Sequence, residues 1–361
     1  LNSCALAELG LSDDVKDIPG GSYDRREDGS LTGILKENSA DLAIMRLPKP
    51  DRTEKKRLIK EAVTRLHRQG IVAVHSFEGL EEFQLLMEME KDGELDLKVT
   101  CYFNRPDLDD VLDQKLKPGY GHGYVRLCGL KLYADGALGS RSAAVKVPYS
   151  GEPGNYGIDV MTSREMAEFA HRAARAGFPT AIHAIGDRAV SNSLNSLIST
   201  VARFPGVSGH RVEHIQLIDP AEIQLFHKYG IHASVQPCHM LSDIEMVERF
   251  WAEQTGALYP YGSYVRTGAN VMFGSDAPID IEDPLYNIRA AVTRKRLSGN
   301  WSDVSWHPEE RLSMVSAMKA YTSNPVAVEH FGSRAGFGVG YPADFICFDQ
   351  NPFLVDPGRL T

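Results

Sequence analysis

The sequence lacks the features that mark several classes of protein. None of the apolar runs in its 361 residues reaches the roughly 20 residues needed to cross a bilayer, so we expect no membrane partner. No basic stretch followed by an apolar one is visible after Leu1, so no signal peptide is expected. Lysine and arginine number 39 against 48 aspartates and glutamates, and the net charge of −9 argues against a nucleic-acid partner.

Cysteine is also scarce, and its distribution excludes a disulfide scaffold. The number is odd, the positions are scattered and no Cys-x-x-Cys pair occurs. This usage favours a reducing compartment, and we therefore expect a cytoplasmic protein. The five cysteines are Cys4, Cys101, Cys128, Cys238 and Cys347.

What the sequence does have is an alternation of short apolar runs with amphipathic helical stretches. The apolar runs are nearly continuous, as is typical of buried parallel strands. Helices are expected between them at 54–69, 163–176, 187–201, 220–229 and 284–296. The expected strands are 71–75, 97–103, 127–133, 180–183, 210–214, 232–236 and 271–274.

This alternation predicts an α/β fold of the TIM (β/α)₈-barrel type over residues 51–330, because such a barrel takes about 250 residues. Only seven strands are counted, so we expect strand one to be missing. A doubly wound open sheet is the alternative, but no glycine-rich phosphate turn follows an early strand. Residues 1–50 read as a loop-rich insertion segment. Residues 331–361 read as the start of a small β-sandwich, with a strand at 343–349.

Polar residues stand within or just after several expected strands, where a barrel places its active site. They include Lys131, His183, His214 and Asp276. Histidine and carboxylate are ligands of zinc and related ions, and separate strands can bring them to one point. Each also has a structural interpretation: a satisfied core histidine, a lysine at the barrel mouth or an aspartate in a turn. Spacing alone leaves both interpretations open.

Five segments occur in an order that resembles one family. Together they closely resemble the amidohydrolase family 3 proteins, the branch that includes N-substituted formamide deformylase-like enzymes. The resemblance extends from about Asn2 to Pro357, and the tail ADFICFDQNPF is similar to the family's return into a β-sandwich. The segments are GLKLYADGALGSR (129–141), AIHAIGDRAV (181–190), RVEHIQL (211–217), SVQPCHM (234–240) and FGSDAPI (273–279).

The resemblance implies a role for each matching residue. Lys131 would be a lysine that can be carboxylated to bridge two metal ions, and His183 and His214 would be metal ligands. Asp276 would bind metal and transfer the proton. Near the substrate, the resemblance places His239, as the candidate to stabilise an oxyanion, with Asp135, Arg141 and Gln236 as substrate-binding residues.

One departure from the family pattern matters. The family carries a His-x-His at the end of strand one, and this sequence contains none. We therefore interpret the chain as a fragment that lacks that strand, with a metal site that is incomplete and activity that is low or absent.

The resemblance thus implies metal-dependent hydrolysis of a C–N bond in an amide, formamide or cyclic imide, with Zn²⁺ or a related divalent ion as cofactor. The partner expected is a small-molecule substrate, and a homodimer is compatible with this interpretation. Two rival functions stay open. One is a metal-free binding or regulatory protein on the same fold. The other is an isomerase or aldolase in which Lys131 forms a Schiff base.

Overall fold

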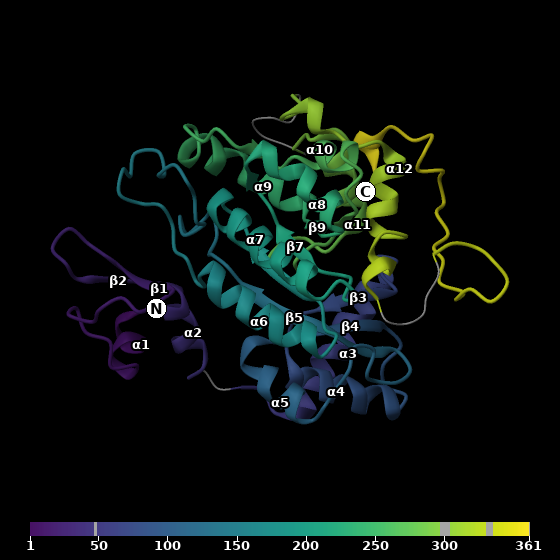
Figure 1. The fold of residues 1–361 in the computed structure, drawn as a ribbon, viewed down its shortest axis with the longest axis horizontal. Helices are drawn as coiled ribbons and strands as arrows, with labels where there is room; N and C mark the ends of the chain where they lie inside the picture. Colours follow the sequence, from purple (N-terminus) through teal and green to yellow (C-terminus); the bar gives the residue numbers. More distant parts are fainter. Residues whose placement is uncertain (47–48, 297–303, 330–334, 361) are drawn as a thin grey trace.

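A curled parallel sheet of seven strands forms the centre of the protein (Figure 1). The computed structural model describes residues 1–46, 49–296, 304–329 and 335–360. All seven predicted strands are present, and the prediction of a TIM-like barrel fold is confirmed. The strands are β3 (Ala73–Ser76), β4 (Lys98–Asn104), β5 (Val125–Tyr133), β6 (Thr180–Ala184), β7 (Arg211–His214), β9 (His232–Val235) and β11 (Val271–Phe273).

Each strand of this sheet pairs with the sheet strand that precedes it in the chain. The order is therefore β3-β4-β5-β6-β7-β9-β11, and Lys131 aligns with Ala181 on β6, which aligns with Arg211 on β7. The sheet is open between its two edge strands, β3 and β11, and no eighth strand joins them within the described residues. A separate antiparallel pair joins β8 (Leu217–Ile218) to β10 (Ala257–Leu258).

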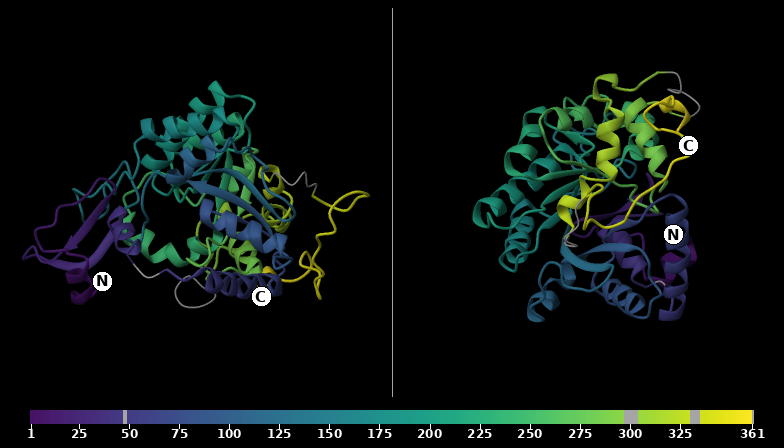
Figure 2. Two further views of the ribbon diagram at one scale, coloured as in Figure 1. Left: turned by 90° about the horizontal axis from the view of Figure 1, so that it is seen from below. Right: turned by 90° about the vertical axis from the view of Figure 1, so that its right-hand side faces the viewer.

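Helices connect the strands and cover the outer face of the sheet (Figure 2). Among the described helices, none is both long enough and apolar enough to span a membrane. The described α-helices from residue 52 onward are α3 (Arg52–Arg68), α4 (Leu80–Lys91), α5 (Leu108–Asp113), α6 (Ser163–Arg175), α7 (Asp187–Arg203), α8 (Ile223–Tyr229), α9 (Pro237–Phe250), α10 (Tyr261–Arg266), α11 (Pro284–Thr293) and α12 (Met314–Tyr321). Single 3₁₀ turns are η1 (Arg105–Asp107), η2 (Pro220–Glu222), η3 (Pro308–Glu310), η4 (Pro325–Val328) and η5 (Pro357–Arg359).

Local sequence signals set several helix ends. Thr162 caps α6, because its hydroxyl accepts the backbone N–H of Glu165 while the Glu165 carboxylate accepts the N–H of Thr162. At the other end of a helix, α8 ends at Gly230, whose φ of 63° is a left-handed conformation that glycine adopts readily. Between the helices and the sheet lies the main apolar core, in which the rings of Phe103 and Phe178 are 5.1 Å apart.

The N-terminal segment is more regular than the loop-rich insertion that the sequence predicts. It contains α1 (Ser3–Glu8), a hairpin of β1 (Gly21–Arg25) with β2 (Leu31–Glu37), and α2 (Asn38–Ile44). The Asp28-Gly29 turn, with φ of 86° at Gly29, closes the hairpin, and this pair is a known hairpin signal. Figure 1 shows this segment beside the loop that follows β5.

The C-terminal segment does not form the strand predicted at 343–349. No strand is present there in the described residues, and Phe345, Ile346 and Phe348 are exposed. A strand needs a neighbouring strand for its backbone hydrogen bonds. The segment instead extends along the outside of the molecule (Figure 1). Asp344 in this segment forms an ion pair with Lys98. The predicted domain boundary at 330–331 lies outside the described residues.

Candidate active site

The carboxyl ends of β6 and β7 bring two histidines together. The ring centroids of His183 and His214 are 4.5 Å apart, with an angle of 67° between the rings. The backbone turns sharply after β7, because His214 and Ile215 have φ values of 75° and 49°. Such conformations are costly for residues other than glycine and cluster at functional sites.

His239 and Asp276 complete this group. His239 lies in the first turn of α9, and its ring stacks on that of His214 at 5.9 Å with 15° between the planes. Asp276 follows β11 with a φ of 57°. Ligand atoms of His214, His239 and Asp276 all lie within 4.8 Å of one another, which is close enough for them to meet around one ion.

The hydrogen bonds of the two strand-end histidines fix which ring nitrogen is free. Nε2 of His183 lies 3.1 Å from the carbonyl oxygen of Gly136, and Nδ1 of His214 lies 2.9 Å from Oε1 of Gln236. Both partners are acceptors, so these nitrogens carry the protons. The lone pairs are then on Nδ1 of His183 and Nε2 of His214. Metal-binding histidines show this arrangement, with the other N–H given to a protein oxygen.

Burial keeps these imidazoles neutral. Desolvation, with a further contribution from Lys131, lowers the pKa of His183 to about 3. Desolvation also lowers the pKa of His214 well below its ordinary value, and His183 and Lys131 add to the effect. The pKa of His239 is lowered mainly by burial, and its Nε2 has no hydrogen-bond partner among the described residues. Neutral imidazole is the form that binds metal ions.

Lys131 and Asp276 are the charged groups of the site. Nζ of Lys131 lies 4.4 Å from the ring centroid of Phe77, and within the described residues it forms neither a hydrogen bond nor an ion pair. Burial lowers the pKa of Lys131 to about 8, against the attraction of Glu213 and Asp276. Asp276 is exposed as a residue, but the protein around its carboxyl group removes part of the water from it. This desolvation raises the pKa of Asp276 to about 6, and the charge of Lys131 opposes the rise. The site therefore holds a lysine and an aspartate that can both change charge near neutral pH.

Asp135, a predicted substrate-binding residue, is buried and already engaged by the backbone. It is 2% exposed, and its carboxyl oxygens accept the N–H groups of Ala144, Ile185 and Gly186. One of these oxygens is also 3.5 Å from Nε2 of His183. Burial raises the pKa of Asp135 to about 8, against those three hydrogen bonds. Its contacts favour a role in holding the loops around His183 rather than direct contact with substrate.

The other two predicted substrate-binding residues differ in their placement. Gln236 reaches the centre, where its oxygen accepts the His214 N–H. Arg141 pairs with Glu152, and its guanidinium lies 5.6 Å from the ring centroid of Phe250. The described contacts of Arg141 do not include the histidines or Asp276.

Sequence reasoning missed a buried ion pair under the site. Arg211 and Glu213 lie two residues apart on β7, so both face the barrel interior, with 2.7 Å between Nε and Oε1. The guanidinium also lies 4.5 Å from the ring centroid of Tyr102, and one of its nitrogens is 2.6 Å from Nδ1 of His75. The signal in the sequence was the charged pair at alternate positions of an otherwise buried strand.

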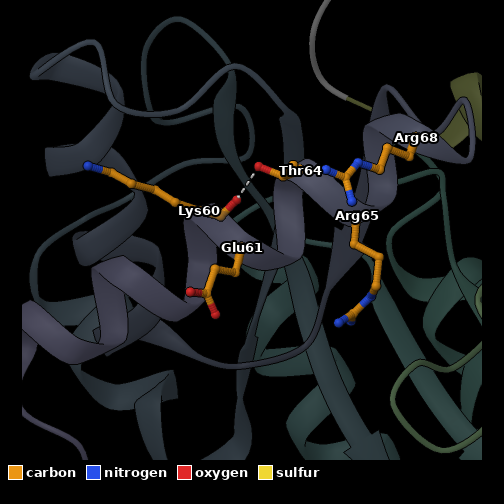
Figure 3. Close-up of a pocket in the computed structure, with 5 residues that line it drawn as sticks. All are labelled: Lys60, Glu61, Thr64, Arg65 and Arg68. Carbon is orange, nitrogen blue, oxygen red and sulfur yellow. Dashed lines mark hydrogen bonds between the residues drawn. The ribbon is translucent and has the colours of Figure 1, made fainter.

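One surface hollow in the described part of the chain lies away from this centre. It has a volume of about 420 Å³ and lies on α3, and Figure 3 shows that one helix supplies its whole lining. The contact drawn there is the Thr64 hydroxyl donating to the carbonyl oxygen of Lys60 at 2.9 Å. The hollow contains no histidine and none of the site residues. The lining residues are Lys60, Glu61, Thr64, Arg65 and Arg68.

A curled parallel sheet with histidines and an aspartate at the carboxyl ends of its strands defines a metal-dependent hydrolase of the TIM-barrel class. The chain belongs to the amidohydrolase family, whose model matches residues 1–361.

Relatives and solved structures agree with this membership. The chain is 27% identical over 373 residues to a Bacillus subtilis (strain 168) protein named amidohydrolase YtcJ, covering 100% of this chain and 68% of that protein. It is 24% identical to the N-substituted formamide deformylase of Arthrobacter pascens, covering 99% of this chain and 68% of the relative. The crystal structure of an uncharacterized metal-dependent hydrolase from Pyrococcus horikoshii OT3 superposes with a TM-score of 0.81 at 28% identity, covering 100% of this chain and 71% of that one. The chain thus spans about two thirds of the length of these relatives.

Proposed function

We propose that this chain carries the catalytic centre of a hydrolase that cleaves a C–N bond in an amide, formamide or cyclic imide with the help of a divalent metal ion. One observation carries the proposal. His183 and His214 lie ring to ring, each giving one N–H to a protein oxygen and keeping one nitrogen free. The name of the Arthrobacter pascens relative supports the bond class.

The residues present fit such an ion. Nε2 of His214 and the Asp276 carboxylate, whose ligand atoms lie within 4.8 Å of each other, would hold it together with Nδ1 of His183, whose ring is 4.5 Å from that of His214. Lys131, whose pKa is lowered to about 8, would add a ligand if carboxylated. Zinc or a related ion bound there would polarise the carbonyl group and lower the pKa of water to about 7.

The chain's own residues would handle the proton and the developing charge. Asp276 accepts a proton from the attacking water as the new C–O bond forms, and returns it to the nitrogen as the C–N bond breaks. His239 presents a buried ring nitrogen that has no hydrogen-bond partner among the described residues, and its N–H stabilises the oxyanion. Gln236 and Asp135 keep His214 and His183 in place. The predicted role of Arg141 in binding substrate stays part of the proposal, whereas for Asp135 the positioning role replaces the predicted substrate contact.

The substrate is a small molecule, the compartment is the cytoplasm, and a homodimer is compatible with the fold. The scattered unpaired cysteines support the compartment, since none of the five forms a disulfide.

Metal removal and restoration test this function. The purified protein is stripped with a chelator and reloaded with Zn²⁺, and release of product is followed on N-benzylformamide, a simple acetamide and a hydantoin. We expect turnover of at least one substrate only in the loaded form, at the low level expected of a site without the His-x-His pair. His214→Ala should abolish it, whereas the matched control His171→Ala, on the surface of α6, should not.

Other outcomes would contradict the proposal. Equal turnover in the stripped protein, together with borohydride trapping at Lys131, would favour Schiff-base chemistry. Binding of these compounds without turnover, in loaded protein as in stripped protein, would favour a binding or regulatory protein.

A further inference from the structure

The N-terminal hairpin contacts the active-site loop through one carboxylate. β2 ends at Glu37, whose Oε1 accepts the hydroxyl of Ser142 at 2.5 Å and that of Ser140 at 3.3 Å. We propose that Glu37 is a positioning residue of the active site, which fixes the loop 136–142 and through it the imidazole of His183. The test of this proposal by Zn²⁺ affinity rests on the proposed function, whereas the test by the tautomer of His183 does not.

Ser142 is the centre of this loop, and Glu37 holds Ser142. The Ser142 hydroxyl accepts the N–H of Ala137 at 3.1 Å, and the Ser142 N–H donates to the Ala137 carbonyl oxygen at 3.0 Å. The hydroxyl therefore uses its lone pair for the loop and its proton for Glu37. Without the carboxylate, that proton can turn to the Ser140 hydroxyl at 2.5 Å or to the Ala137 carbonyl oxygen at 3.4 Å, and neither contact ties the loop to the hairpin.

Gly136 connects Glu37 to His183. A Cβ added at Gly136 would lie 2.2 Å from Oε1 of Glu37 and 2.2 Å from Oγ of Ser142, so only glycine allows this close approach. The carbonyl oxygen of the same residue accepts the Nε2–H of His183 at 3.1 Å. Glu37 thus packs directly against the residue whose carbonyl fixes the tautomer of His183.

The position of Glu37 is maintained at a cost in backbone conformation. Its φ is 51° and its ψ is −128°, which a residue with a side chain adopts rarely. The conformation places the start of α2 and the carboxylate against a loop more than 100 residues away in the sequence. Such strain persists where the surrounding contacts hold it, and it often accompanies a functional role.

The proposal is tested with Glu37→Ala, with Glu37→Gln as the conservative variant, and with Glu27→Ala as the control. Glu27 lies in the exposed turn of the same hairpin, so Glu27→Ala makes the same change of charge away from the loop. Zn²⁺ affinity is measured by competition with a chromophoric chelator. Loss of a residue that holds a metal-binding histidine in place typically lowers metal affinity by about 10–100-fold. We therefore expect the Zn²⁺ affinity of Glu37→Ala to be about 10-fold lower than that of the wild type. Glu37→Gln should recover most of this, since its amide oxygen can accept both hydroxyls.

The second readout needs no metal. In protein labelled with ¹⁵N-histidine, the stripped wild type should show His183 as the Nε2–H tautomer, whereas Glu37→Ala should show a mixture of tautomers. If Glu37→Ala does not fold, Ser140→Ala removes one of the two hydroxyl contacts and should give the same changes at smaller size. Wild-type Zn²⁺ affinity and an unchanged His183 spectrum in Glu37→Ala would overturn the proposal while leaving the proposed function intact. Absence of Zn²⁺ binding in the wild type would instead overturn the metal function, and the tautomer spectrum would still decide the role of Glu37.

Discussion

Arg211 and Glu213 form an ion pair inside the barrel, with their side chains 2% and 4% exposed and 2.7 Å between Nε and Oε1. Two charges in this position are costly to bury, and each is tolerated because the other is present. Removing one partner leaves the other buried without compensation.

We therefore expect Glu213→Ala to lower the free energy of unfolding by about 3–5 kcal/mol, as measured by urea denaturation. The double variant Arg211→Met/Glu213→Leu should lose less unfolding free energy than Glu213→Ala alone, because no unpaired charge stays buried. Glu245→Ala, which breaks a surface pair with Arg296, should cost under about 1 kcal/mol. A double variant less stable than Glu213→Ala would show that the pair itself stabilises the fold.

Asp276→Asn tests the proton transfer. The amide keeps the size of the side chain but cannot accept the proton from water, so kcat should fall by about 10²–10⁴-fold. The measurement is steady-state turnover of whichever substrate the zinc-loaded protein hydrolyses. Glu282→Gln serves as the control, because Glu282 lies on the same loop and pairs with Arg65. An undiminished kcat in Asp276→Asn would assign the proton to another group.

Gln236→Leu should weaken Zn²⁺ binding by about 10–100-fold, because the leucine cannot accept the Nδ1–H of His214. Chelator competition measures the affinity, and circular dichroism checks the fold. Gln224→Leu is the control, since Gln224 lies exposed on α8 and its side-chain amide donates to the carbonyl oxygen of Ala221, away from the histidines. Equal affinity in Gln236→Leu and the wild type would mean that His214 needs no orienting partner.

The Asp243 carboxyl should make stability depend on pH. Burial raises its pKa from the ordinary 3.8 to about 6, although the Tyr259 hydroxyl donates to it at 2.7 Å. Because the folded pKa is the higher one, the fold favours the neutral acid. This contribution is complete below about pH 3.8 and is lost as the pH rises through about 6.

Asp243→Asn removes that titration and keeps an oxygen for Tyr259. Relative to the wild type, it should gain stability between pH 4 and pH 7, by at most about 3 kcal/mol, since one pKa unit corresponds to about 1.4 kcal/mol. Urea denaturation across this range measures the difference. Asp109→Asn, at an exposed pair with Arg172, should show no such gain. A difference that shrinks as the pH rises would contradict the raised pKa.

The sheet could be predicted from the sequence because its strands are buried on both faces and therefore appear as continuous apolar runs. The same rule failed at 343–349, where an apolar pattern has no neighbouring strand in the described residues. The rule also failed to predict the two strands within the first 50 residues. β1 and β2 are polar and pair with each other, so the sequence shows only a weak apolar pattern there.

The site was predictable in part for a similar reason. The ends of neighbouring parallel strands meet at one edge, so His183 and His214 were expected to converge, and the structure brings their rings together. The supporting contacts depend on chain segments far apart in sequence. Asp135 binds backbone about 50 residues away, and Glu37 reaches a loop more than 100 residues away. No local pattern encodes such contacts, which is why these roles emerged only from the structure.

The order of the strands has a consequence for biosynthesis. Because each strand of the parallel sheet pairs with the strand made just before it, the sheet can grow by one edge as the chain leaves the ribosome. His183 and His214 are then in place while the rest of the chain is still being made. Asp276 follows β11, the last described strand of the sheet, so the cluster of His214, His239 and Asp276 can form only at the end of the sheet's assembly.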